Sequence, residues 1–174
     1  MKFYSGFSLK NEHHFFDAYI NSSEYTVCGF SYGAIKAFIH VKEQLSLRKR
    51  VDTLQLFSPA FFSTKDEKFK KLQLLGYRKS RNIYLSEFIK SCFLPYKEKK
   101  VEYNNRDSIE ELEELLYYEW TVEELQYLTN NGVKIEVYLG AEDRIIDVGG
   151  ARKFFLQVAT VTYIKEANHF LLTN

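Results

Sequence analysis

The stretch EYTVCGFSYG, residues 24–33, decides how the rest of the chain is interpreted. Its first seven residues are rich in β-branched and aromatic side chains, which predicts a strand, and a helical pattern begins at Tyr32. Ser31 stands at the junction between Gly29 and Gly33. Side chains on these two flanking residues would collide with neighbouring backbone in a tight turn. The pattern therefore predicts a strained strand-to-helix turn that presents the Ser31 hydroxyl at a helix N-terminus, where the dipole favours negative charge.

Five segments have the composition of strands and are mostly bounded by turn residues: residues 1–5, 24–30, 52–58, 133–140 and 159–164. Helical patterns lie between them, over Asn11 to Ile20 with Asn11 as the N-cap, over Tyr32 to about Lys49, and over Gly150 to Val158. Strands that alternate with helices form a parallel sheet through right-handed crossovers. The sequence therefore predicts one α/β domain with a mainly parallel sheet of about five strands.

The alternation stops between about residues 62 and 130, where no segment has a convincing strand pattern. Helical patterns cover residues 66–75, 85–93 and 108–128, and Ser108 with Glu111 fits a capping box. An insertion at the carboxyl edge of a parallel sheet lies over the place where ligands bind. We therefore predict a helical lid over approximately residues 62–130.

Composition excludes several classes of protein. Apolar residues make up 45% of the chain and charged residues 27%, which argues against a disordered or fibrous protein. No apolar run has the length of a signal peptide or of a bilayer span, so we expect a cytoplasmic protein that does not bind membranes. Cys28 and Cys92 are too few for a disulfide framework or a cysteine-rich metal site, and we expect free structural thiols.

The net charge of +1 hides two opposed blocks of charge. Residues 64–100 hold eleven Lys and Arg against four Asp and Glu, whereas residues 101–130 hold one against nine. These blocks either pair with each other within the lid or leave a basic surface for an acidic partner. Nucleic acid is disfavoured as that partner, because no aromatic and basic motif accompanies the charge.

A serine hydroxyl becomes a strong nucleophile when a histidine takes its proton and a carboxylate holds the histidine in the correct tautomer. His169 follows the last predicted strand, and Asp143 follows the strand before it, with Asp147 close behind. Ser31, Asp143 and His169 would thus each lie at the end of a different parallel strand. They are the predicted catalytic residues. Asp147 remains an alternative acid, and simpler roles as caps, packing residues or surface residues remain open.

Several stretches resemble the pimeloyl-[acyl-carrier protein] methyl ester esterases of biotin synthesis, in particular the short BioV type, which is similar to the longer BioH type. Ser5–Glu12 looks like the family's glycine-aromatic oxyanion loop, and Phe57–Ser63 looks like its strand end that leads into the lid. The sequences GFSYG, GAED and ANHF add to the resemblance. The matches are short, but they are scattered over almost the whole chain.

The resemblance implies a shortened α/β-hydrolase fold, with Ser31, Asp143 and His169 as the triad and the amides of Phe7 and Tyr32 as oxyanion donors. Strands that normally precede the oxyanion loop are missing, and the chain ends just after His169 without the usual closing helix. Crossovers that all run the same way would leave one face of the sheet open. A homodimer or a folded-back lid would then cover that face.

The implied reaction is hydrolysis of the methyl ester of pimeloyl-[acyl-carrier protein] methyl ester, which needs no metal or organic cofactor. The predicted walls of the acyl site are Phe30, Ser58, Phe61, Phe62, Phe93, Tyr117 and Trp120. Acyl carrier proteins are acidic, so the predicted docking residues come from the basic block: Lys70, Lys71, Arg78, Lys79, Arg81, Lys97, Lys99 and Lys100. Two alternatives share the same fold, namely another short-chain acyl esterase or thioesterase, and a catalytically inactive module that binds an acyl carrier.

Overall fold

The computed structural model describes all 174 residues and contains a five-stranded sheet in which every neighbouring pair is parallel. The strand order is β1-β3-β4-β6-β7. The bounds are Lys2–Tyr4 for β1, Thr26–Phe30 for β3, Thr53–Phe57 for β4, Lys134–Gly140 for β6 and Thr160–Ile164 for β7. Each strand lies within a segment predicted from the sequence, and the α/β fold class is confirmed.

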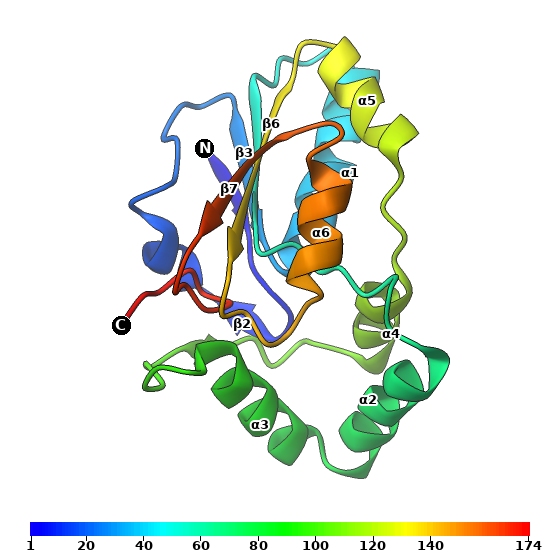
Figure 1. The fold of residues 1–174 in the computed structure, drawn as a ribbon. Coiled ribbons are helices and arrows are strands. Elements are labelled where there is room, and N and C mark those ends of the chain that lie inside the picture. Colours follow the sequence, from blue (N-terminus) through cyan, green and yellow to red (C-terminus); the bar gives the residue numbers. More distant parts are fainter.

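Three helices cover one face of this sheet (Figure 1). They are α1 (Tyr32–Ser46), α5 (Val122–Asn130) and α6 (Val148–Phe155). Leu56 of β4 and Val137 of β6 point toward this layer and are fully buried. The crossovers from β3 to β7 move along the sheet in one direction, and right-handed connections then place their helices on the same face, whereas the β1–β3 connection lies on the other.

The opposite face is covered by the chain between β1 and β3, which was predicted to be a helix over residues 11–20. Only a short 3₁₀ segment, η1 (Glu12–Phe16), forms there, and Asn11 adopts a left-handed conformation without capping it, so both predictions are wrong. The Phe16 ring stacks on Phe57 of β4 with centroids 4.8 Å apart. The buried side chain of Gln55 accepts a hydrogen bond from the backbone N–H of residue 21 and donates one to the carbonyl of residue 19. Backbone groups that a helix would have paired are therefore satisfied by the sheet.

Because this segment packs on β1, β3 and β4, the lid does not fold back onto that face. Toward the other edge, polar side chains remain, including Thr160 and Thr162 of β7 and the ion pair Lys134–Glu136, whose Nζ and Oε1 lie 2.6 Å apart. An exposed polar surface needs no apolar cover. The homodimer stays a prediction, although the uncovered part of this face is polar.

The insertion between β4 and β6 lies beyond the carboxyl ends of the strands (Figure 1). It holds α2 (Glu67–Lys79), α3 (Arg81–Phe93), α4 (Ile109–Tyr117) and α5. Ser108 accepts from the Glu111 amide at 3.3 Å, which confirms one half of the predicted capping box, whereas the Glu111 carboxylate pairs with Lys36 instead of returning to Ser108. The single helix predicted over residues 108–128 is divided at residues 118–121, and α5 returns to pack on β6.

A two-residue antiparallel ladder pairs β2 (Leu9–Lys10) with β5 (Glu102–Tyr103) and ties the loop after β1 to the lid. It was not predicted, because two residues show no periodicity.

Cys28 and Cys92 are buried and free, as expected, and burial raises the pKa of the Cys28 thiol to about 12. No helix combines the length and the apolar character that crossing a membrane requires.

Candidate active site

Ser31 occupies the predicted strained turn between β3 and α1. Its backbone has φ 53° and ψ −115°, a region that residues with a side chain rarely adopt. A Cβ on Gly29 would lie 2.2 Å from the carbonyl oxygen of Gly33, and one on Gly33 would lie 2.1 Å from the carbonyl oxygen of Tyr4. Neither distance is sterically allowed, so glycine is required on both sides of Ser31.

The side chains of His169 and Asp143 form a buried pair. Nδ1 of His169 lies 2.6 Å from Oδ2 of Asp143, and both side chains are at most 1% exposed. The other carboxylate oxygen accepts hydrogen bonds from the amides of Ile145 at 2.8 Å and Ile146 at 3.4 Å. Because a carboxylate can only accept, Nδ1 carries the proton, and Nε2 is the basic nitrogen. Nε2 is buried and has no hydrogen-bond partner.

Asp147 has a different role. Its carboxylate accepts from the Gly150 amide at 3.0 Å and from the Thr64 hydroxyl at 2.8 Å, and it caps the N-terminus of α6. The Gly150 hydrogen bond lowers the pKa of the Asp147 carboxyl. Asp143 rather than Asp147 therefore contacts the imidazole, which contradicts the alternative pairing.

The histidine loop packs against the strand that ends at the serine. The His169 ring lies 5.0 Å from the ring of Phe30, the residue before Ser31. No hydrogen bond joins the Ser31 hydroxyl to His169 in this structure, and Ser31 is 5% exposed. Nucleophile–base hydrogen bonds are often long without substrate. The structure thus joins Asp143 to His169 directly and places His169 next to the turn that carries Ser31.

The loop after β1 lies against the N-terminus of α1. A Cβ on Gly33 would collide with the carbonyls of Tyr4 and Ser5, so glycine permits this close contact. The Phe7 and Tyr32 rings are 6.4 Å apart. The amide of Phe7 donates to no protein acceptor, and the amide of Tyr32 is the first in its helix, where no intrahelical carbonyl is available. Both amides predicted to bind an oxyanion therefore belong to adjoining segments.

Glu12 is a site feature that the sequence did not reveal. Its carboxylate is 1% exposed, and Oε1 accepts from the Gly6 amide at 2.7 Å, directly before Phe7. Oε2 has no partner, and burial raises the pKa of this carboxyl. A glutamate beside two histidines in a polar stretch gave no signal of burial.

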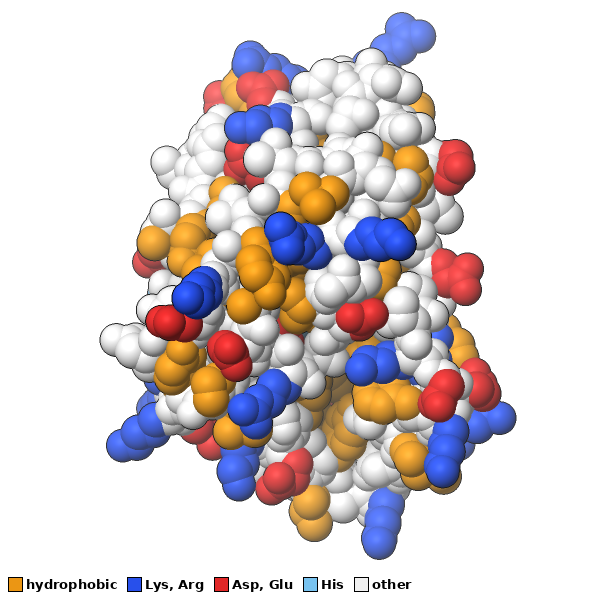
Figure 2. All heavy atoms as spheres, viewed as in Figure 1, with side chains coloured by type: hydrophobic (Ala, Val, Ile, Leu, Met, Phe, Trp, Pro, Cys, Tyr) orange, Lys and Arg blue, Asp and Glu red, His pale blue; other side chains and the backbone are white.

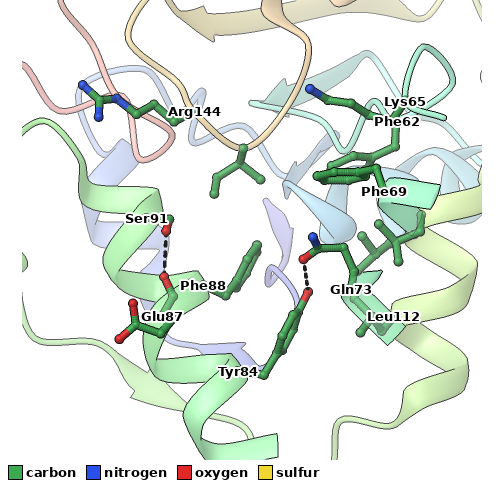
Figure 3. A pocket seen from close by; sticks show the side chains of 13 residues that line it. Phe62, Lys65, Phe69, Gln73, Tyr84, Glu87, Phe88, Ser91, Leu112 and Arg144 are labelled. Carbon is green, nitrogen blue, oxygen red and sulfur yellow. Dashed lines mark hydrogen bonds between the residues drawn. The ribbon is translucent and has the colours of Figure 1, made fainter. Parts of the chain in front are cut away.

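A cavity of about 350 Å³ lies between the lid helices and the loop after Asp143 (Figure 3). Aromatic and aliphatic side chains form most of its wall, and Lys65 and Arg144 stand on opposite sides of its rim in Figure 3. The lining residues are Phe62, Lys65, Phe69, Gln73, Tyr84, Glu87, Phe88, Ser91, Leu112, Leu115, Leu116, Arg144 and Ile145.

Among the seven predicted acyl-site residues, Phe62 lines this cavity. The remaining six do not, since the predicted aromatics mostly fill the core between sheet and lid. Trp120 is 7% exposed and donates from Nε1 to the carbonyl of Ala60, and Tyr117 donates from its hydroxyl to Glu67 on the surface. The other four are buried in the core: Phe30, Ser58, Phe61 and Phe93.

The acidic block neutralises little of the basic block, since Arg81–Asp107 is the one ion pair that joins them. Two glutamates of the acidic block pair with α1 instead, through Lys36–Glu111 at 2.8 Å and Lys42–Glu124 at 2.5 Å. Lys and Arg side chains consequently project from the end of the molecule formed by α2 and α3 (Figure 2). Arg81 differs from the other predicted docking residues, because its guanidinium pairs with the buried carboxylate of Asp107. The remaining seven are exposed or half-exposed: Lys70, Lys71, Arg78, Lys79, Lys97, Lys99 and Lys100.

Comparison with known proteins identifies the fold. No family model and no curated protein matches this sequence. Among solved structures, bromoperoxidase of Bacillus anthracis aligns with TM-score 0.61 at 13% identity, over 83% of this chain and 60% of the other. Naproxen esterase of Bacillus subtilis aligns with TM-score 0.53 at 20% identity, over 84% and 53%.

BioG of Haemophilus influenzae aligns with TM-score 0.58 at 9% identity, over 97% of this chain and 87% of the other. This chain thus spans little more than half the length of the esterase but nearly the whole of BioG. At these identities the likeness establishes the fold, which is a small α/β-hydrolase-like fold as the sequence resemblance implied.

Proposed function

We propose that this protein is a serine-dependent carboxylic ester hydrolase, with Ser31 as nucleophile, His169 as general base and Asp143 as the residue that orients the imidazole. The observation that carries the proposal is the buried His169–Asp143 hydrogen bond, which leaves Nε2 unpaired on a ring that packs against Phe30, the residue before the strained turn at Ser31. Strain at a glycine-flanked serine has no evident structural use, whereas such a turn presents a nucleophile at a helix N-terminus. The esterases among the structural neighbours support the same class of reaction.

The order of proton transfers follows from the proton on Nδ1 of His169, which leaves Nε2 as the base. Ser31 Oγ attacks the ester carbonyl carbon while Nε2 of His169 takes the hydroxyl proton, and the carboxylate of Asp143 stabilises the resulting imidazolium. The amides of Phe7 and Tyr32 would donate hydrogen bonds to the developing oxyanion. The imidazolium then gives its proton to the departing alcohol, which leaves an acyl-serine. Water, deprotonated by Nε2, attacks this acyl group, and Ser31 is released with its proton restored.

For the substrate, we propose pimeloyl-[acyl-carrier protein] methyl ester, cleaved in the cytoplasm to methanol and the carrier-bound acid. The short sequence stretches described above support this choice, as does the likeness to BioG, a biotin-pathway enzyme, over most of both chains. The basic surface on α2 and residues 97–100 supports an acidic carrier as partner, because only Arg81 of the basic block forms an ion pair with the acidic block. Arg81 is not part of this surface, since its guanidinium pairs with the carboxylate of Asp107.

The direct test incubates the purified protein and Ser31→Ala with the carrier-bound methyl ester and measures loss of the methyl group by mass spectrometry. The parent should demethylate the substrate, and Ser31→Ala should not. A fluorophosphonate probe should label the parent at Ser31 alone. Turnover that survives in Ser31→Ala would remove the mechanism, while turnover of other esters or thioesters but not of this one would remove the substrate. Tight carrier binding without any turnover would favour the inactive binding module.

Carrier docking is tested separately by salt. Surface charge pairs weaken as ionic strength rises. Activity on the carrier-bound ester should therefore fall with added NaCl, while activity on a free methyl ester should change little. Equal salt sensitivity of the two substrates would exclude the proposed docking surface.

A further inference from the structure

The cavity between the lid helices adjoins the candidate active site through three separate contacts. Ile145 lines the cavity, and its amide donates to Asp143 at 2.8 Å. Phe62 lines it from a segment whose Ala60 amide donates to the carbonyl of Ser31 at 3.1 Å. Phe88 lines it from α3, with its ring 6.4 Å from that of Phe7. The serine turn, the acid and the oxyanion loop each have a neighbour in the cavity wall.

The wall suits an aliphatic chain. Eight of its thirteen residues are hydrophobic, and Figure 3 shows Phe62, Phe69, Tyr84 and Phe88 around the same space. The volume of about 350 Å³ is at the small end of the range for ligand pockets, roughly 300–1,000 Å³. It therefore suits a short acyl chain rather than a peptide.

The rim carries two cations that form no ion pair, although the charge of Lys65 contributes to the lowered pKa of the Asp147 carboxyl. Lys65, which precedes α2, and Arg144, which follows Asp143, form no ion pair, although other basic residues such as Lys36, Lys42 and Arg81 do. Figure 3 shows the two cations on opposite sides of the opening. Glu87 of α3 is the one acid among the lining residues, and it is also unpaired.

We propose that this cavity holds the aliphatic part of an ester substrate, and that Lys65 and Arg144 bind an anionic group at the end of that chain remote from the ester. The inference rests on the proposed hydrolase and narrows its substrates to esters with an anionic tail. Two sources supply such an anion. One is the carboxylate that ends a short dicarboxylic monoester, which would replace the carrier-bound substrate proposed above. The other is the phosphate at the far end of a carrier's prosthetic arm, which would keep that substrate. Glu87 acts against the anion and moderates its binding.

The test compares kcat/KM within two matched pairs of esters. The first pair is monomethyl heptanedioate, which ends in a carboxylate, and the neutral amide in which that carboxylate is replaced by a carboxamide. The second pair is the pantetheine thioester of monomethyl heptanedioate with and without the terminal phosphate of the arm. Partly exposed charge-assisted contacts should give the anionic member a preference of roughly 3- to 10-fold. The pair that shows the preference identifies the source of the anion.

Three variants that each remove one charge at the rim test the anion site, and the acid variant should change the anionic-to-neutral ratio in the opposite direction from the two cation variants. Lys65→Gln and Arg144→Gln should each lower the anionic-to-neutral ratio, and Glu87→Gln should raise it. Lys68→Gln is the matched control, because Lys68 is exposed on α2 outside the cavity, and the ratio should stay at the parental value. A ratio near one in both pairs for the parent, or a ratio that both cation variants leave unchanged, would overturn the inference.

Failure of the proposed hydrolase has a different signature, namely no Ser31-dependent cleavage of any ester. The cavity is then tested by calorimetry alone, with monomethyl heptanedioate and its neutral amide as probes. Tighter binding of the carboxylate that is lost in Lys65→Gln supports the anion site. Equal affinity for the two probes refutes it.

Discussion

Asn168 connects the lid to the histidine loop, and its removal should destabilise both. Its side chain is fully buried and makes three hydrogen bonds to backbone. Nδ2 donates to the carbonyl of Phe93 at the end of α3 at 2.8 Å, while Oδ1 accepts from the amides of Phe170 at 3.0 Å and Leu172 at 3.1 Å. Asn168→Ala leaves the amides of Phe170 and Leu172 without partners, next to His169, and removes one of the two hydrogen bonds to the carbonyl of Phe93, which also accepts from the amide of residue 96.

Each buried polar group left unsatisfied costs about 1–3 kcal/mol. Entry of water into the vacated space offsets part of this, so the total loss should be about 3–5 kcal/mol. At about 2–4 °C per kcal/mol for a chain of this size, the melting temperature should fall by roughly 6–20 °C. Because the loop that carries His169 loosens, kcat on any accepted ester should fall more than KM rises.

Thermal melting and urea unfolding at neutral pH measure the stability loss, with Asn105→Ala as the matched control. Asn105 is exposed on the lid, and its side chain makes no hydrogen bond, so its loss should stay within about 0.5 kcal/mol. If Asn168→Ala melts within about 2 °C of the parent, corresponding to at most about 1 kcal/mol, the three hydrogen bonds do not hold the loop and the reasoning is wrong.

Two further predictions concern carboxylates. Asp143→Asn should lower kcat by roughly 10³–10⁴-fold, since an amide can hold the imidazole in the wrong tautomer. Asp147→Asn should leave kcat within about threefold, because Asn also caps helices. Equal losses of kcat for the two variants in steady-state assays would contradict the assignment of Asp143. Burial raises the folded-state pKa of Glu12 above its ordinary 4.5, so the folded protein binds the extra proton and its free energy of unfolding falls as pH rises above that value. Glu12→Gln, which keeps an acceptor for the Gly6 amide, should therefore gain stability relative to the parent between pH 4 and pH 8 in urea titrations, and a parallel pH dependence would show that this carboxyl does not titrate as inferred.

Local sequence determined the parts of this protein that depend on neighbours along the chain. The five strands were predictable because each is a short run of β-branched and aromatic residues with clear boundaries. The turn at Ser31 was predictable because Gly29 and Gly33 are the only residues that its sterics allow. The strand order was not predicted, but the prediction that Ser31, Asp143 and His169 each follow a different parallel strand needed only the strand positions in the sequence.

Tertiary structure decided which side chains meet. Asp143 and Asp147 follow the same strand and look equivalent in sequence, but the position of β7 beside β6 brings His169 to Asp143 and leaves Asp147 to cap α6. Most of the aromatic residues predicted for the acyl site lie in the core. The cavity is instead lined by Phe69, Tyr84 and Phe88, and these residues belong to no recognisable sequence motif.

The segment from residue 11 to residue 25 shows the physical reason. Its own pattern favours a helix, yet Gln55, more than thirty residues away along the chain, supplies hydrogen bonds to its backbone, and Phe57 supplies a surface for Phe16. Periodicity and sterics act between residues close in sequence and can be read from it directly. Hydrogen-bond and packing partners are chosen by the path of the whole chain, so they exist only once the sheet has assembled.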